Sequence, residues 1–220
     1  MTSNDETPRP PATPEFAHVA AGGPAFVYPS QAGVEVRKLS VGTFDNNVYL
    51  LMAGDEAVLI DGAAEPERLL AEAAPYRVTA ILQTHNHPDH TGALRALKRA
   101  WPEVPVFAHE QDPPPVPFES LDGGVTMRLG PADILVIHTP GHTPGSLCYL
   151  MGTHLFTGDT MFPGGPGNSG RDPKRFERIM QSLDGLFELP DETRVSPGHG
   201  LDTTIGRERP YVQTWRRRGW

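Results

Sequence analysis

Cysteine is nearly absent from this chain of 220 residues, which contains only Cys148. A single cysteine cannot form a disulfide within the chain, which indicates a reducing compartment. Cys148 lies in the short apolar run Ser146–Leu150, which predicts a small buried core residue rather than a reactive thiol. The lack of cysteine also argues against a structural zinc site, which often uses thiolate ligands.

Long apolar runs and basic patches are also lacking. No stretch approaches the ~20 apolar residues of a membrane span, and the N-terminus lacks the features of a signal peptide. The formal net charge of −8 would repel phosphate backbones. The one basic run, Arg216–Arg218, is interpreted as a solvated tail. We therefore expect a cytoplasmic protein that acts on a small molecule and binds neither nucleic acid nor membranes; the oligomeric state stays open.

Proline is concentrated near the N-terminus, with six prolines in residues 1–32 and few clustered apolar residues. Such a segment buries too little surface to offset the entropy lost on ordering, so it is predicted to be largely disordered. Phe16, Phe26 and Tyr28 could still dock onto the rest of the protein. Residues 33–220 are the right size for a single catalytic domain.

Short apolar runs and helical patterns alternate from Val34 onward. Strands are predicted over Val34–Leu39, Val48–Met52, Ala57–Ile60, Thr79–Gln83, Val104–Ala108, Val125–Leu129, Ile134–His138, Ser146–Leu150, His154–Thr157 and Thr193–Val195. Helices are predicted over Pro66–Ala74, Gly92–Ala100 and from a cap at Asp172 to Phe187. The continuous apolar runs Ala57–Ile60 and Ile134–Ile137 suit strands buried on both faces. The pattern predicts an α+β fold of two packed sheets covered by helices.

Four candidate metal ligands lie within the six residues His85–His90, whose sequence is HNHPDH. This run follows directly on the apolar strand residues Ala80–Leu82. Its first two histidines stand at i and i+2, so an extended backbone projects both from the same side and they can bind one ion. The turn at the proline can aim the aspartate and the last histidine toward a second ion.

Three further polar residues stand in glycine-rich turns after predicted strands: His142, Asp159 and His199. Glycine lets the backbone bend tightly and approach an ion closely. Loops at strand ends are where binding sites gather. Side chains of nitrogen and oxygen type from several segments exceed what a closed structural zinc site needs, which favours a catalytic binuclear site.

The order His-x-His-x-Asp-His, Gly-His, Gly-Asp and a late Gly-His resembles the signature of the metallo-β-lactamase superfamily, over roughly residues 34–205. The resemblance implies a four-layer αββα sandwich with two divalent metal ions at one edge of the sheets, zinc foremost, with iron or manganese as alternatives. The residues that match its ligands are His85, His87 and His142 for the first ion, Asp89, His90 and His199 for the second, and Asp159 for the bridge. Asp61 matches an acidic residue that organises the site, and Asp89 could also orient the nucleophile or relay its proton.

The histidines outside this pattern are given plainer interpretations. His18 and His154 are interpreted as surface residues. His109 and His138 lie on or beside predicted strands and are interpreted as core residues or as support for the ligands.

Within the superfamily, the runs Thr139–Ser146 and Phe156–Gly165 resemble the compact glyoxalase II-like branch. This resemblance implies hydrolysis of a thioester, such as the S-acyl conjugate of a small thiol, by a metal-bound hydroxide. The helical extension that holds glutathione in typical glyoxalase II has no counterpart after Trp220, so the thiol stays open. Arg207 and Arg209 are each interpreted either as a contact for an anionic substrate tail or as an ordinary surface arginine.

A second function on the same fold is that of the persulfide dioxygenases, which use one iron. His85, His142 and Asp159 would be the ligands in that case. The Gly-Cys-Gly-Arg-Thr-Asp-Phe-like stretch associated with that group is replaced here by Gly165–Gly170, which favours the hydrolase. A hydrolase of lactones or other esters is a further alternative.

Overall fold

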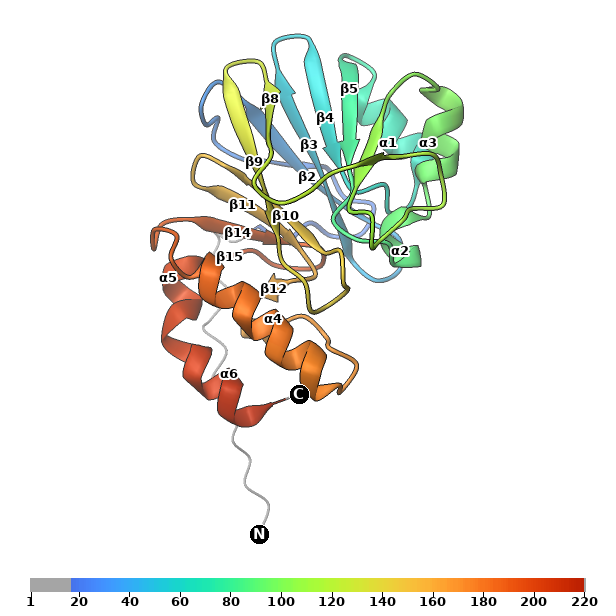
Figure 1. Ribbon diagram of the computed structural model, residues 1–220. Coiled ribbons are helices and arrows are strands. Elements are labelled where there is room, and N and C mark those ends of the chain that lie inside the picture. Colours follow the sequence, from blue (N-terminus) through green and yellow to red (C-terminus); the bar gives the residue numbers. More distant parts are fainter. Residues whose placement is uncertain (1–16, 220) are drawn as a thin grey trace.

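Two β-sheets pack face to face in the computed structural model, which describes residues 17–219 (Figure 1). Within these residues the first sheet has the order β1 (Phe26–Val27), β2 (Glu35–Val41), β3 (Asn46–Ala53), β4 (Glu56–Ile60), β5 (Arg77–Leu82), β6 (Val106–Ala108) and β7 (Glu119–Ser120). The second has the order β15 (Thr203–Thr204), β14 (Arg194–Pro197), β11 (His154–Gly158), β10 (Leu147–Met151), β9 (Ala132–His138) and β8 (Thr126–Leu129). Strands β12 (Met161–Phe162) and β13 (Gly165–Pro166) form a separate antiparallel pair.

Helices cover the outer face of each sheet, which completes the predicted four-layer αββα sandwich (Figure 1). The first sheet is covered by α1 (Pro66–Ala73) and α3 (Leu94–Ala100), and the short α2 (Pro88–Thr91) lies at its edge. The second is covered by α4 (Pro173–Leu186), α5 (Ile205–Glu208), the 3-10 turn η1 (Arg209–Tyr211) and α6 (Val212–Arg218). Asp172 caps α4 as predicted, because its carboxylate accepts from the backbone amides of Lys174 and Arg175. Among residues 17–219, no helix is both long and apolar enough to cross a membrane.

Strand β4 is buried on both faces, as its continuous apolar sequence predicted. Val58 and Ile60 enter the core between the two sheets, whereas Ala57 and Leu59 pack under α1 and α3. The same prediction fails for β9, where Leu135 keeps 36% of its surface exposed. The helix layer therefore covers the outer face of β9 incompletely.

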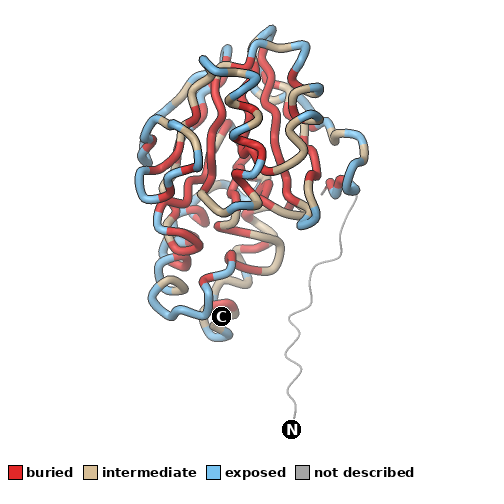
Figure 2. Tube along the Cα trace, turned by 90° about the vertical axis from the view of Figure 1, so that its right-hand side faces the viewer, coloured by how far each residue is buried: buried red, intermediate tan, exposed pale blue. Residues whose placement is uncertain are grey.

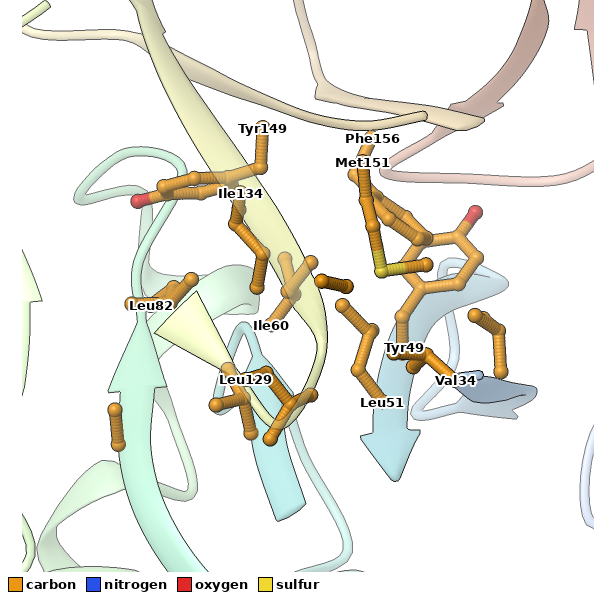
Figure 3. Packing of buried hydrophobic residues seen from close by; sticks show 14 of the residues in the cluster. Val34, Tyr49, Leu51, Ile60, Leu82, Leu129, Ile134, Tyr149, Met151 and Phe156 are labelled. Atoms are coloured by element: carbon orange, nitrogen blue, oxygen red, sulfur yellow. The ribbon is translucent and has the colours of Figure 1, made fainter. Parts of the chain in front are cut away.

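The core between the sheets also fixes the backbone where the strands end. Figure 3 shows Ile60 and Leu51 of the first sheet beside Ile134 and Met151 of the second. Two buried tyrosines carry hydrogen bonds from this core to the chain. The Tyr149 hydroxyl donates to the carbonyl of Gln83 and the Tyr49 hydroxyl to that of Pro197, both at 2.7 Å. Gln83 and Pro197 stand at the ends of β5 and β14, so the packing of the core fixes the positions of both strand ends.

The outer face of the second sheet packs against α4 and α6, and this corrects the prediction of a solvated C-terminal tail. Trp215 of α6 is buried among the apolar residues that cover this sheet. Arg216 lies in the same helix and forms an ion pair with Asp184 of α4. Figure 2 shows buried segments along the strands and exposed segments on the outer loops. The burial of Trp215 explains the difference, because one large apolar side chain anchors the basic run in a helix.

Part of the proline-rich segment also packs against the domain. Strand β1 pairs with β2, the Lys38 ammonium donates to the carbonyl of Ala17 at 2.9 Å, and the Tyr28 hydroxyl donates to Asp202 at 2.7 Å. The predicted boundary at residue 32 therefore falls inside the packed region, because Tyr28 contributes a buried ring and a buried hydrogen bond. Residues 1–16 lie outside the described residues, and the expectation for them stays a prediction.

Replacing Tyr28 by Phe tests whether this segment contributes to stability. The variant keeps the ring but leaves the buried Asp202 without one donor, so we expect a loss of about 1–3 kcal/mol in the free energy of unfolding. Urea denaturation measures it. Val27→Thr on the half-exposed side of β1 is the control and should change the stability by less than about 0.5 kcal/mol. Equal stabilities of wild type and Tyr28→Phe would show that the segment merely lies on the surface.

Candidate metal centre

The predicted ligands lie where four strands end. The segment His85–His90 follows β5 of the first sheet, and His142, Asp159 and His199 follow β9, β11 and β14 of the second. Strands β9, β11 and β14 run in one direction, because β10 is antiparallel to β9 and β11 while β14 is parallel to β11. Their carboxyl ends therefore meet at one edge, where the loops can converge on one site.

The first group of side chains is His85, His87 and His142, whose ligand atoms all lie within 4.8 Å of one another. His142 Nε2 stands 3.0 Å from His87 Nδ1. The rings of His85 and His142 meet edge to face with their centroids 4.9 Å apart. Three imidazole nitrogens therefore lie close enough together to hold one ion, and their role as its ligands stays a prediction.

The second group is Asp89, His90 and His199, again with ligand atoms within 4.8 Å of one another. His90 Nε2 lies 3.1 Å from His199 Nε2, and His199 Nε2 lies 3.4 Å from Asp89 Oδ2. Pro88 begins α2, and the helical turn carries Asp89 and His90 away from the first group. The geometry is compatible with the predicted division of the HNHPDH run between two ions, which stays a prediction.

Asp159 stands between the two groups. Its Oδ2 is 3.5 Å from His142 Nε2 of the first group and 3.5 Å from His199 Nε2 of the second. Two glycines make room for it: a Cβ on Gly198 would collide with the Asp159 carboxylate, and one on Gly167 with its carbonyl oxygen. The position suits a carboxylate that contacts two cations.

Two buried atoms of the site lack hydrogen-bond partners, namely His85 Nε2 and Asp159 Oδ1. Buried polar atoms are nearly always satisfied, so each such atom needs an explanation. A cation between the side chains would satisfy both at once. The donors are imidazole nitrogens and carboxylate oxygens, which suit zinc and also iron or manganese. The residues present therefore fit metal ions.

The pKa shifts in the site bear on how its histidines would bind a cation. Burial lowers the pKa of His85 well below its ordinary value, which keeps that imidazole neutral and able to bind a cation. Burial would also lower the pKa of His90, but the hydrogen bond and charge of Asp61, aided by Asp159, raise it to about 9. A cation that binds His90 must therefore displace a proton at neutral pH.

Asp61 orients His90, and its own backbone is strained. The carboxylate accepts from His90 Nδ1 at 2.9 Å, from the backbone amide of Thr84 at 2.8 Å and from Gln83 Nε2 at 2.9 Å. With Nδ1 bound to Asp61, Nε2 of His90 is left to face the centre. Asp61 adopts φ 63°, a left-handed conformation that is uncommon outside glycine and is held here by these bonds.

Other ligands are oriented in the same way. His142 Nδ1 bonds to the carbonyl of Asn168 at 2.9 Å, and His199 Nδ1 to that of Phe44 at 2.8 Å. His85 Nδ1 lies 2.9 Å from the hydroxyl of Thr84. Each of these rings therefore presents Nε2 to the centre, and the tautomer is fixed by its partner.

Several residues that support the site carry little signal in the sequence. Asn46 Nδ2 donates to Asp89 Oδ2 at 3.1 Å, yet only its place at the start of a strand marks it. Lys38 is completely buried, and its ammonium donates to the carbonyl of Gly200 at 2.6 Å and to Asp202 at 2.9 Å. It thereby holds the loop that carries His199. A lysine within a β-strand reads as a surface residue, so sequence patterns do not reveal this role.

Of the histidines outside the two groups, some lie where the sequence predicted and one does not. His18 is exposed as expected, and its ring bonds to Asp45. His154, predicted on the surface, is instead buried on β11, where it bonds to Ser196 at 2.7 Å and stacks on Phe156. The ring of Tyr28 also meets it edge to face, with the centroids 4.8 Å apart, and helps to cover it. His109 and His138 stack on each other with their centroids 4.2 Å apart.

Arg207, the predicted contact for an anionic substrate tail, lies in α5. Backbone hydrogen bonds from Ile205 and Gly206 tie this helix to the loop 190–193. Figure 1 places α5 at the opposite side of the molecule from α2. The structure therefore does not bring Arg207 to the two ligand groups.

An αββα sandwich with imidazole and carboxylate side chains gathered at its strand ends has the architecture of a metal-dependent hydrolase. The chain belongs to the metallo-β-lactamase superfamily, whose sequence model matches residues 41–199. It is 35% identical over 169 residues to a hydroxyacylglutathione hydrolase of Xanthomonas axonopodis pv. citri, a match that covers 74% of this chain. The chain spans only 65% of the length of that relative.

Two solved structures add to this comparison. The protein TTHA1623, solved in a di-iron-bound form, is 38% identical, with a TM-score of 0.68 over 78% of this chain and 96% of that one. ETHE1 from Myxococcus xanthus is 32% identical, with a TM-score of 0.72 over 80% of this chain and 82% of that one.

Replacing Asp61 by Asn tests its hold on His90. Asparagine keeps the shape and tolerates the left-handed backbone, but it loses the charge that faces the ring. We expect about 10- to 100-fold weaker zinc binding, measured by competition with a chromogenic chelator. Asp133→Asn, an exposed carboxylate on β9, is the matched control and should bind zinc as wild type does. Unchanged affinity in Asp61→Asn would remove Asp61 from the site.

Proposed function

We propose that this protein is a binuclear metal-dependent hydrolase that cleaves a thioester, such as the S-acyl conjugate of a small thiol. The observation that carries the proposal is the pair of ligand groups, His85–His87–His142 and Asp89–His90–His199, with the Asp159 carboxylate within 3.5 Å of nitrogens in both. A single ion would use only half of this arrangement. The likeness to a hydroxyacylglutathione hydrolase supports the same reaction class.

Two bound cations would supply Lewis acidity for the substrate carbonyl and lower the pKa of a water between them. The chain's own residues would hold and orient the reactants. Asp89 is the partly open carboxylate of the second group, with 30% of its side chain exposed. Burial would raise its pKa, but the hydrogen bond from Asn46 and the charge of His90 lower it, so Asp89 stays ionised and can accept a proton.

The leaving group follows from what the site offers. A thiol has a pKa near 8.5, so a thiolate departs with little help from an acid, whereas an amine requires protonation. Asp89 and Asp159 both have lowered pKa values and are poor acids at neutral pH. Phe162 lies beside His199, with ring centroids 6.2 Å apart, and provides an apolar surface for an acyl group. These features favour thioesters over amides.

A mononuclear iron persulfide dioxygenase is the second candidate, and the likeness to ETHE1 supports it. That function would use His85, His142 and Asp159 and would leave the second group without a task. Hydrolysis of lactones or other esters would use the same site as thioester hydrolysis and differs only in the leaving group. The di-iron form of TTHA1623 supports two ions and leaves iron as an alternative to zinc.

Metal analysis tests the binuclear site. The protein reconstituted with zinc should carry about two ions per chain by elemental analysis. Asp159→Ala removes the carboxylate that separates the two groups and offsets cation repulsion, so we expect the loss of at least one ion and of most activity. His18→Gln, at an exposed histidine, should keep both. A wild type that never exceeds one ion after reconstitution contradicts the proposal.

The reaction itself separates the two candidate functions. Zinc-loaded protein should hydrolyse S-lactoylglutathione or a related thioester under nitrogen, because hydrolysis needs water and no oxidant. The iron form should take up no oxygen with glutathione persulfide in an oxygen electrode. Rapid oxygen uptake, with no thioester cleavage by any metal form, would replace the hydrolase by the dioxygenase. Cleavage of a lactone but not of a thioester would reassign the substrate.

A further inference from the structure

An open cavity of about 470 Å³ lies between the first half of α4 and the loop that follows β9. Pro140 and Pro144 form part of its wall, and His138 stands at the end of β9. The His138 ring is fixed from two sides, since it stacks on His109 and its Nε2 donates to the carbonyl of Pro144 at 2.9 Å. The cavity therefore has a preformed wall.

The cavity adjoins the metal centre through a shared loop. Gly141 and Thr143 line it, and His142 between them turns its Nε2 toward His87 in the first ligand group. Arg175 of α4 also lines the cavity and donates to the carbonyls of Gly141 and His142. A molecule seated in the cavity would lie one loop away from the metal ligands.

Three basic side chains line the α4 side: Lys174, Arg175 and Arg178. Among the described residues, no carboxylate lies within ion-pair distance of these three, although the chain has 27 acidic and 19 basic residues. Arg216 of α6, by contrast, is paired with Asp184. Arg175 and Arg178 have only neutral hydrogen-bond partners, so their charges are not neutralised locally, and basic groups of this kind around a cavity favour the binding of anions.

The helix itself compensates only part of this positive charge. Lys174 and Arg175 stand in the first turn of α4, where positive charges oppose the helix dipole, and the one carboxylate at this helix end is that of the capping Asp172. Lys174 and Arg178 are like charges at i and i+4, which repel each other. Asp172 at the N-cap and Glu177 on the same helix offset part of this repulsion, and an anion in the cavity would offset more of it.

We propose that this cavity binds the anionic end of the substrate, a carboxylate or a phosphate of its carrier, while the acyl group reaches the metal centre. The proposal rests on the proposed thioester hydrolysis and names a feature of its substrate. Lys174 and Arg178 are the specificity-determining residues, because both line the cavity and both are exposed. They take the role that the sequence had suggested for Arg207.

Kinetics with three thioesters test the proposal on the zinc-loaded, full-length protein. S-acetylglutathione carries carboxylates, acetyl-coenzyme A carries phosphates, and S-acetyl-N-acetylcysteamine is neutral. The double variant Lys174→Glu/Arg178→Glu should raise KM about tenfold or more for at least one anionic substrate, with kcat and the neutral substrate unchanged. An effect on one anionic substrate identifies its group as the one recognised.

Arg99→Glu/Arg217→Glu is the matched control, because it makes the same change in net charge at exposed positions on α3 and α6. It should leave all three KM values within about twofold of wild type, since exposed charges that are distant are screened. Equal KM values in wild type and the α4 double variant for both anionic substrates would overturn the proposal. A rise that includes the neutral substrate would also overturn it.

Binding without turnover separates this proposal from the proposed function. Isothermal titration with S-methylglutathione and with desulfo-coenzyme A should show about tenfold weaker binding of one of them to the α4 double variant. If that loss is seen although no thioester is cleaved, the anion site stands and the hydrolase proposal fails. If thioesters are cleaved but neither probe distinguishes the variant from wild type, the anion site fails alone.

Discussion

The carboxylate of Asp61 is the constraint on which the site depends. It joins the end of β4 to the segment after β5 through bonds to Gln83, Thr84 and His90. The first ligand segment begins directly after these residues, so a shift of Asp61 would move both ligand groups. Its strained backbone persists because the bonds outweigh the cost, about 1–3 kcal/mol, of the left-handed conformation.

Buried residues beneath the site fix the backbone from which the candidate ligands extend. Tyr149 and Tyr49 extend from the core between the sheets to the carbonyls of Gln83 and Pro197, where ligand segments begin. Lys38 does the same for the loop that carries His199. These segments are therefore restrained, because each follows a strand end that the packed core holds in place. Burial of a charged ammonium group costs much free energy unless hydrogen bonds and an opposite charge replace its water, and Lys38 has both.

Charge is divided between two neighbouring regions. The metal centre gathers carboxylates and imidazoles, and Asp159 and Asp89 keep lowered pKa values despite partial or full burial. On the other side of the loop that carries His142, three basic residues of α4 without a carboxylate partner line a cavity. A substrate with an electrophilic carbonyl at one end and an anion at the other would match both regions. This arrangement gives an acidic protein a local attraction for anionic molecules.

Strand and helix patterns in the sequence predicted two packed sheets covered by helices, and the resemblance to the metallo-β-lactamase superfamily predicted the αββα class and the candidate ligands. Both were possible because the HNHPDH run and the glycine-rich turns are local features of the chain. The sequence could not determine which elements meet. The burial of His154, the anchoring of Arg216–Arg218 by Trp215 and the packing of Tyr28 all depend on partners distant in sequence. Arg207 and Lys174 are alike as basic residues on helices, and only the placement of α5 and α4 distinguishes them. Tertiary structure decides such matters because burial and charge pairing are properties of contacts, which local sequence does not encode.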